Sequence, residues 1–433
     1  MSDDFDDALA LANGPATAAT LAAPAPRTPG TAHPPRRTGP RHPDEPSWDA
    51  ARATAHRAAR PLPPRRLPLD LALGHTLAAP LTALTDLPAF DTSAMDGWAV
   101  AGPGPWRLTD TPDARGLLAG GTTGPRIGDG QAVPIATGAR LPEGATAVLR
   151  AEHGTVTGRR LTGAGPQHGT DIRPRGQECR TGTELLPART VLTPAALGLA
   201  AAAGYDQLAV RPRPRAEVLV LGDELLHRGL PHDGRVRDAL GPMTGPWLTA
   251  LGAQTLVTRR LGDDAEALHE AISTSRADLI VTTGSTAHGP VDHLRAVLDR
   301  LGAHLLISGV AVRPGHPMLL AELPSGPPLI GLPGNPLAAV SGLLTLAAPL
   351  LCGLADRPAP ADRPATLTDP VKGHPHDTRL VPVIRPEPGL ATPLTYTGPA
   401  MLRGIAAATA LAVIPPGGAR EHARVRLLDL PQA

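Results

Sequence analysis

Aromatic residues are scarce in this chain of 433 residues, where phenylalanine, tyrosine and tryptophan together make up 2%. Cysteine occurs only at Cys179 and Cys352, which are too few and too far apart to predict a disulfide framework or a zinc site. Lysine occurs only at Lys372, so arginine carries nearly all of the positive charge. Apolar residues still make up 42% of the chain. Its hydrophobic cores must therefore be built mainly from leucine, alanine and valine.

Long apolar runs, a secretory signal and a strong charge of one sign are also missing. No apolar run reaches the roughly 18 residues that a membrane-spanning helix needs. The N-terminus lacks a charged start followed by an apolar segment, so we expect no secretory signal. A formal net charge of +1 argues against binding nucleic acid through bulk charge. We therefore expect a cytoplasmic enzyme that binds neither a membrane nor nucleic acid.

The length of the chain predicts several domains, because one hydrophobic core rarely grows past roughly 250–300 residues. The first part is rich in alanine, proline and arginine without an apolar period, which is typical of a disordered tail. Short segments broken by glycine and proline predict β structure in two places. We expect a disordered tail at 1–47, a helical linking domain at 48–87 and 171–211, a β-rich domain at 88–170, an αβα domain at 212–357 and a C-terminal β domain at 358–433.

Strand and helix patterns alternate through residues 212–357. Buried-type strands at 216–221, 279–283 and 328–332 are separated by helical patterns, and hairpin turns are absent. This alternation predicts a mostly parallel sheet with helices on both faces. The fold class is therefore α/β multidomain, with a central αβα domain, a β-rich module and a small C-terminal β domain. Further helices are expected at 48–60, 70–77 and 265–275.

The segment 88–100 holds a dense set of polar groups between large apolar side chains. Phe90 and Trp98 bracket two carboxylates and two hydroxyls, which are costly to bury without partners. On residue types alone a capped turn is the first interpretation, with one residue of 91–93 capping a helical turn at 94–95 before a strand. The alternative is a functional site on a loop that apolar side chains hold in place.

Glycine-rich loops follow three of the predicted strands, at 222–224, 284–289 and 333–336. Ligands bind at the carboxyl ends of strands in open α/β sheets, and glycine lets backbone N–H groups face an anion. For any single loop, glycine and asparagine that only make the turn are the better interpretation, but three such loops on one edge favour a shared pocket. If a phosphate binds there, Glu224 and Asp292 predict a Mg²⁺ site, because Mg²⁺ takes one or two carboxylates plus phosphate oxygens. Otherwise Asp292 is a first-turn helix residue and Glu224 a solvated acid.

Motifs along the chain resemble, in order, those of the molybdopterin molybdotransferase family, which includes the C-terminal domain of gephyrin. Residues 88–100 read Pro-Ala-Phe-Asp-Thr-Ser-Ala-Met-Asp-Gly-Trp-Ala-Val, which is similar to the hallmark segment of that family. The resemblance covers roughly residues 48–433. Residues 136–145 resemble the family's Thr-Gly-Ala loop, 171–176 its Arg-rich turn, 312–317 its Pro-Gly segment and 332–336 its Pro-Gly-Asn-Pro loop.

The resemblance implies insertion of molybdenum into adenylylated molybdopterin with release of AMP. It also implies molybdate as the second substrate, Mg²⁺ as a cofactor, and an elongated homodimer with sites between the subunits. Arginine at two of the positions suits molybdate or phosphate through its guanidinium fork. Carried over by position, the catalytic residues are Asp96, Glu178, Asp263 and Arg313, the substrate-binding residues are Thr137, Arg173, Gly222, Gly284, Ser285, Gly289, Gly334 and Asn335, and the metal ligands are Glu224 and Asp292.

Three positions depart from the pattern that the resemblance leads us to expect. Ser285 stands in place of a second glycine, Leu240 in place of an asparagine and Gly309 in place of a pocket lysine. Arg313 and His316 replace two further lysines. These departures keep open a second hypothesis, a relative that binds a pterin or nucleotide, or acts as a scaffold, without catalysing insertion. A plain nucleotide-binding α/β protein is a third, but it leaves the segment 88–100 unexplained.

Overall fold

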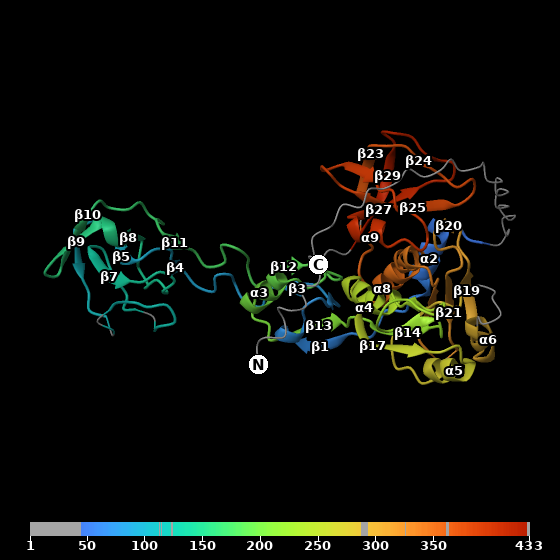
Figure 1. Ribbon diagram of the computed structural model, residues 1–433. Coiled ribbons are helices and arrows are strands. Elements are labelled where there is room, and N and C mark those ends of the chain that lie inside the picture. Colours follow the sequence, from blue (N-terminus) through green and yellow to red (C-terminus); the bar gives the residue numbers. More distant parts are fainter. Residues whose placement is uncertain are drawn as a thin grey trace, which may run out of the picture. The chain divides into compact units, whose positions relative to one another are not determined.

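The computed structural model describes residues 45–111, 113, 115–122, 124–286, 293–324, 326–360 and 363–430 (Figure 1). Most of the expected tail therefore lies outside the described residues. Two of the expected site residues, Gly289 and Asp292, lie outside them as well.

A six-stranded sheet forms the centre of the αβα domain (Figure 1). Its first four strands run parallel, and β21 runs antiparallel between β22 and β19. The mostly parallel sheet is thus confirmed, and its one antiparallel strand, β21, was not predicted. In sheet order the strands are β17 (Gln254–Leu261), β14 (Arg215–Leu221), β18 (Leu279–Thr283), β22 (Leu329–Leu332), β21 (Leu319–Glu322) and β19 (His304–Ser308).

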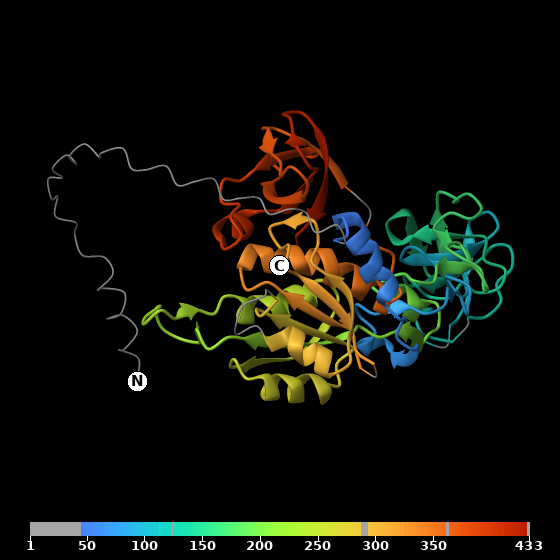
Figure 2. The ribbon, with the colours of Figure 1, turned by 90° about the vertical axis from the view of Figure 1, so that its right-hand side faces the viewer.

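Helices cover both faces of this sheet, with α5 and the α7–α8 helix on opposite sides in Figure 2. Leu268 and Ile272 of α5 pack with Leu298 of α6 against one face. Leu248 of α4 and Trp48 of α2 belong to the core on the other face. Because helices bury both faces of the sheet, its strands appear in the sequence as continuous apolar runs. The helices are α2 (Trp48–Ala58), α4 (Leu240–Ala250), α5 (Ala265–Ser273), α6 (His293–Arg300), α7 (Pro336–Gly342) and α8 (Ala348–Leu354).

One helix is long and apolar enough to cross a membrane, which corrects the expectation that no such segment exists. Residues Pro336–Leu354 have a mean hydropathy of 2.0, and the helix contains a π-helical turn, η3 (Leu343–Ala347). However, 94% of this stretch is buried inside the protein. Trp48 also donates its indole N–H to the Thr345 hydroxyl at 2.9 Å. The helix is therefore the core helix of the αβα domain.

The chain approaches α2 along the central domain. Ser47 caps α2 by accepting the N–H of Ala50, and the Pro46 carbonyl accepts the N–H of Ala311 at 3.1 Å. Residues 45–47, assigned to the tail from sequence, thus make specific contacts.

The linking part contains a three-stranded sheet in the order β1-β13-β2, a two-stranded pair β3–β12 and one helix. Residues 70–77 do not form the expected helix. Gly74 adopts a φ of +75°, which an α-helix cannot accommodate, and the following strand β2 pairs with β13. The elements are β1 (Arg65–Pro68), the 3₁₀ turn η1 (Leu69–Leu71), β2 (Thr76–Leu77), β3 (Leu81–Thr82), β12 (Glu184–Leu186), α3 (Pro194–Ala202) and β13 (Gln207–Arg211).

The β-rich module is a six-stranded sheet, β8-β5-β7-β6-β10-β9, with a short β4–β11 pair beside it. The helical turn expected at 94–95 is wrong. Ser93 is a strand residue paired with Ile172, and its N–H donates to the Ala139 carbonyl, so ladder bonds replace the cap. The elements are β4 (Thr92–Ser93), β5 (Gly97–Ala101), β6 (Trp106–Leu108), β7 (Gln131–Ile135), β8 (Ala147–Arg150), η2 (Ala151–His153), β9 (Gly154–Thr157), β10 (Arg160–Gly163) and β11 (Ile172–Arg173).

The C-terminal part is a small β-barrel. β25 pairs with both β26 and β27, and β23 and β29 complete the ring, while β20 adds to its rim. Buried Leu367, Val383 and Ile414 fill the interior. The elements are β20 (Val312–Arg313), β23 (Arg363–Leu367), β24 (Val371–Lys372), β25 (Thr378–Ile384), β26 (Leu390–Pro393), α9 (Arg403–Ala407), β27 (Ala410–Ile414), β28 (Gly418–Ala419) and β29 (Arg424–Asp429).

Candidate functional site

A cavity of about 390 Å³ opens where the carboxyl ends of β14, β18 and β22 lie side by side. It brings together four of the expected site residues, Glu224, Gly284, Gly334 and Asn335. The remaining walls come from β15 (Leu225–Leu226), β16 (Val236–Arg237), the start of α4, and Ala400 and Leu402 near α9. Loops that are far apart in sequence thus share one pocket, as the strand ends predicted.

The loops that carry this site require glycine. Gly222 has a φ of +130°, and a β-carbon at this position would lie 2.2 Å from Oε2 of Glu224. Gly284 has a φ of +87°, which L-residues rarely adopt. Ser285 follows it at a φ of +53°, a left-handed conformation that favours glycine and costs a serine roughly 1–2 kcal/mol. The serine therefore occupies a backbone conformation that favours glycine.

Two carboxylates line the cavity, and they differ in their partners. Glu224 is exposed and makes no side-chain hydrogen bond or ion pair with any described residue, so both of its oxygens can bind a ligand. Asp238 is only 4% exposed, and its Oδ1 accepts the N–H of Gly241 at 2.8 Å. Its Oδ2 lies 3.3 Å from Nε of Arg260. Asp238 therefore fixes the start of α4 and was missed from sequence, where its only signal was a position just before a helix.

Asn335 stands at the start of α7 without capping it. Its side chain makes no capping hydrogen bond, although asparagine is a preferred cap. The next backbone N–H, that of Leu337, donates instead to the Pro399 carbonyl at 2.9 Å. The Asn335 amide is thus exposed on the cavity wall, where it can bind a ligand.

The other expected residues of the sheet edge do not line the cavity. Asp263 follows β17, one strand beyond β14, and precedes Asp264, which caps α5 through the N–H groups of Glu266 and Ala267. Gly222 lies two residues before the cavity residue Glu224. Gly289 and Asp292 lie outside the described residues, so their assignment stays a prediction.

In the β-rich module the structure brings Asp96 and Thr137 together. Oδ1 of Asp96 accepts the Thr137 N–H at 2.6 Å and its hydroxyl at 2.8 Å. The backbone bond, followed by the hydroxyl bond, lowers the pKa of Asp96 below its usual value. Both side chains are exposed. An ionised Asp96 therefore faces solvent from a fixed position.

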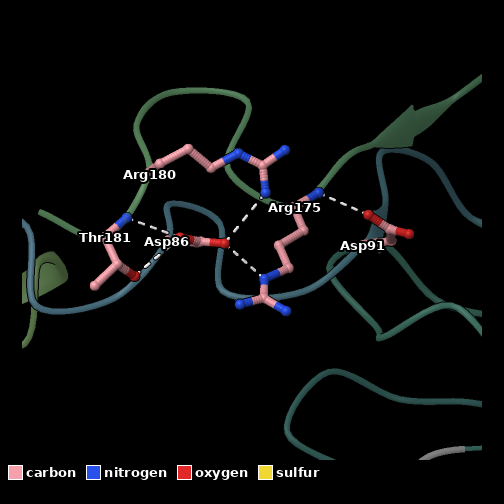
Figure 3. Close-up of polar contacts among 5 residues, drawn as sticks. All are labelled: Asp86, Asp91, Arg175, Arg180 and Thr181. Carbon is pink, nitrogen blue, oxygen red and sulfur yellow. Dashed lines mark hydrogen bonds and ion pairs between the residues drawn. The ribbon is translucent and has the colours of Figure 1, made fainter. Parts of the chain in front are cut away.

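A buried carboxylate joins the two segments that lead into and out of the β-rich module (Figure 3). Oδ1 of Asp86 accepts the N–H and hydroxyl of Thr181 at 2.8 and 2.9 Å. Its Oδ2 accepts Nε of Arg175 at 2.6 Å and Nη1 of Arg180 at 3.2 Å, and the Arg175 N–H donates to Asp91. The Thr181 N–H is the largest of the causes that hold the pKa of Asp86 far below its ordinary range. Sequence reasoning missed this cluster, because its members are close only after folding.

Arg173 and Glu178 lie on the returning segment, and both are exposed. Arg173 pairs with Thr92 across the β4–β11 ladder, and the Glu178 N–H donates to the Leu87 carbonyl at 2.9 Å. Neither residue lines the cavity at the sheet edge. Their expected catalytic and binding roles stay predictions.

Arg313 points to the C-terminal barrel. Its Nε donates to Oδ2 of the buried Asp377 at 2.8 Å, and Nδ1 of His374 lies 3.2 Å from the same oxygen. One edge of the guanidinium is thus engaged, while the side chain stays about half exposed.

A carboxylate stands where the family resemblance led us to expect a lysine. Gly309 follows β19, which ends at the same edge of the sheet as β22. Oε1 of Glu45 lies 3.0 Å from the position that a β-carbon of Gly309 would take. Oε2 of the same side chain lies 2.8 Å from Nε2 of His316. The local charge at this edge therefore differs from the expected one.

A larger hollow of 730 Å³ lies in the β-rich module between residues 102–105 and 160–168. None of the expected site residues lines it. We therefore take the sheet-edge cavity as the candidate site, because it offers an amide and a carboxylate that make no side-chain hydrogen bond with the described residues. Such a set suits a phosphate ester or anhydride together with a divalent cation.

Three family models match consecutive parts of the chain. The MoeA N-terminal region (domain I and II) matches residues 46–204, the probable molybdopterin binding domain matches 217–352, and the MoeA C-terminal region (domain IV) matches 364–424. The first match contains the β-rich module, the second the sheet with the cavity, and the third the barrel.

Curated proteins give the same assignment, and a solved structure has a similar fold. A Staphylococcus aureus (strain COL) protein named molybdopterin molybdenumtransferase is 30% identical over 310 residues, which are 67% of this chain and 72% of that protein. A Bacillus subtilis (strain 168) protein of the same name is 30% identical over 386 residues, which are 84% and 88% of the two chains. The fold is similar to a molybdopterin biosynthesis MoeA protein from Pyrococcus horikosii, with a TM-score of 0.71, 23% identity, and coverage of 89% and 99%. The resemblance inferred from the motifs is thereby confirmed: this chain belongs to the molybdopterin molybdenumtransferase family.

Proposed function

We propose that this protein is a transferase of molybdenum cofactor biosynthesis, which inserts molybdate-derived molybdenum into adenylylated molybdopterin and releases AMP. In this reaction the two dithiolene thiols displace one oxygen of molybdate, which leaves with their protons as water. Water cleaves the phosphoanhydride to give AMP and the phosphate of the pterin. Molybdenum keeps its oxidation state, so no reductant or oxidant is needed.

The sheet-edge cavity is the observation that carries this proposal. Gly284 and Gly334 let the backbone approach an anion, and Asn335 offers an uncommitted amide. Glu224 offers an uncommitted carboxylate beside them. A bare carboxylate would repel a phosphate, so its place in a phosphate site is explained by a cation between the two.

We assign Glu224 as a Mg²⁺ ligand, with Asp292 as its expected second carboxylate. Within the described parts of the chain no cluster of three or more histidine, cysteine or acidic residues could hold a metal by itself. Mg²⁺ usually takes one or two protein carboxylates and completes its shell with water and substrate phosphate. The donor set at the cavity therefore fits. When bound, the ion would neutralise the phosphoanhydride, while the chain's own glycine loops and Asn335 orient it.

AMP release tests the proposal directly. Purified protein is offered adenylylated molybdopterin, molybdate and Mg²⁺, and AMP is measured by chromatography. Glu224→Gln should lower turnover by at least about 100-fold at limiting Mg²⁺, because a charged metal ligand is lost. Asp223→Asn is the matched control, since this neighbouring acid does not line the cavity. Equal turnover of the two variants would contradict the assignment of Glu224.

One observation favours the second hypothesis, a relative that binds without turnover. Glu45 places a negative charge next to Gly309, where the family resemblance predicts a lysine. A carboxylate there would disfavour an oxyanion unless His316 carries a proton. Binding of adenylylated molybdopterin without any release of AMP would support this hypothesis and would contradict the transferase.

We also propose that this protein is a homodimer located in the cytoplasm, as the sequence led us to expect. Asp96, Thr137 and Arg173 do not line the cavity of their own chain. A dimer whose second subunit supplies them would give these residues a role in the site. Light scattering during size-exclusion chromatography tests this, and a mass of one chain at micromolar concentration would contradict it.

A further inference from the structure

Four arginines of the β-rich module form no ion pair among the described residues, and two of them, Arg140 and Arg173, lie close together on the β-ladder around Thr92. Their neighbours are engaged: Arg150 pairs with Asp171 at 2.7 Å, and Arg175 pairs with Asp86. Arg140 and Arg173 are both exposed. Arg140 and Arg173 thus leave two positive charges without a counter-charge among the described residues.

The β-ladder puts these two side chains on one face. Thr92 pairs with Arg173 on one side and with Arg140 on the other, both in antiparallel register. Directly opposite residues of antiparallel strands project to the same face of a sheet. With strands roughly 4.8 Å apart, the two arginine backbones are separated by about 10 Å across Thr92. Side chains as long as arginine can converge on one anion over that distance.

An exposed aromatic ring borders the same face. Phe90 is 42% exposed, although it is one of only two phenylalanines in the chain. Cζ of Arg140 lies 5.5 Å from the centroid of its ring. The ring orients the guanidinium by a cation–π contact and leaves a surface on which a planar heterocycle can stack.

The nearby carboxylates do not cancel this charge. Oδ1 of Asp91 accepts the Arg175 N–H, and Oδ1 of Asp96 is held by Thr137. Neither acid forms an ion pair with Arg140 or Arg173 in the described structure. Arg140 and Arg173 are therefore available to bind an anion.

We propose that Arg140 and Arg173 together clamp a phosphate of the pterin substrate, with Phe90 against its planar ring. Arg140 is thus a further substrate-binding and specificity-determining residue. This inference rests on the proposed function, because it takes adenylylated molybdopterin as the ligand. Bidentate guanidinium–phosphate contacts are charge-assisted and strong, so Arg140 should act on binding more than on chemistry.

Kinetics of AMP release separate the two effects. Arg140→Ala should raise KM for adenylylated molybdopterin at least about tenfold, with kcat and KM for molybdate within about twofold of wild type. The KM of Arg140→Lys should lie between those of wild type and Arg140→Ala, because lysine keeps the charge but lacks the planar guanidinium fork. Arg107→Ala is the matched control, since Arg107 is another exposed arginine of the same module without an ion pair in the described chain. The side chains are exposed, so all of these variants should fold, which circular dichroism checks.

Equilibrium dialysis with adenylylated molybdopterin, without molybdate, distinguishes failure of this inference from failure of the proposed function. If wild type binds but releases no AMP, the transferase is refuted, yet weaker binding by Arg140→Ala than by Arg107→Ala still supports the clamp. Equal binding of the substrate by wild type and Arg140→Ala overturns the clamp. A change of oligomeric state in Arg140→Ala, with unchanged substrate affinity of the remaining dimer, also overturns it.

Discussion

Gly222→Ala is the sharpest test of how the loop after β14 holds the cavity carboxylate, Glu224. The φ of +130° at this position is one that alanine rarely adopts, and the new β-carbon would lie 2.2 Å from Oε2 of Glu224. The backbone strain should lower the free energy of unfolding by roughly 1–3 kcal/mol. The clash itself should add little to this, because the end of a flexible side chain can move aside. It must move away from the cavity wall, so the variant displaces Glu224 without changing it.

Gly302→Ala provides the matched control for backbone strain. Gly302 has a φ of +67° after α6, and the nearest atom to its β-carbon position is 3.6 Å away, on Pro324. We expect a loss of about 1–2 kcal/mol in unfolding free energy, with no effect on the cavity. Urea titration followed by tryptophan fluorescence measures both losses.

The functional readout is the Mg²⁺ concentration that gives half-maximal AMP release. It should rise at least about tenfold in Gly222→Ala, as expected when a metal ligand is displaced, and stay at the wild-type value in Gly302→Ala. If Gly222→Ala loses stability but keeps the wild-type Mg²⁺ dependence, Glu224 does not bind the metal from the position seen here.

Three further predictions concern single side chains. Thr181 holds the pKa of Asp86 below the ordinary value of 3.8. The ionised carboxylate therefore stabilises the folded state fully above that pH, and this stabilisation is lost as the pH falls further. Asp86→Asn should flatten the acid-unfolding curve below about pH 4, measured by circular dichroism. Ser285→Gly should raise the unfolding free energy by roughly 0.5–1 kcal/mol in urea titration, since glycine tolerates the φ of +53°, and an unchanged value would argue against strain there. Glu45→Gln should lower KM for molybdate by about threefold if the oxyanion passes His316, whereas a higher KM would show that the carboxylate assists binding.

Local patterns were sufficient to predict the parallel strands of the central sheet, although not β21. β14 and β18 are buried on both faces and read as unbroken apolar runs, so their strand ends could be found from sequence. The glycines at those ends then predicted a shared pocket, which the cavity confirms for Gly284 and Gly334. The helix predicted at 70–77 is wrong. The apolar spacing there suits a helix, but Gly74 and pairing with a distant strand outweigh it.

What could not be predicted depends on contacts between distant segments. Asp238 and Asp86 read as ordinary surface acids, and only folding buries them beside Arg260 and Thr181. Glu45 belonged to a stretch with the composition of a tail, yet it lies against His316. Composition predicts only that an acidic side chain is usually exposed. The positions of these three carboxylates depend on partners that are distant in the sequence.

The β3–β12 pairing has a consequence for how the chain can be cut and rejoined. Leu81 pairs with Leu186, and Thr82 with Glu184, so the two ends of the intervening hundred or so residues emerge next to each other. The β-rich module is thus an insertion, tied at its base by Asp86. Replacing it with a short turn closes a small loop in place of a long one, which lowers the entropy lost on folding. The excised module and the shortened remainder should each fold as independent proteins, and a mixture of the two would then reveal which steps require covalent attachment.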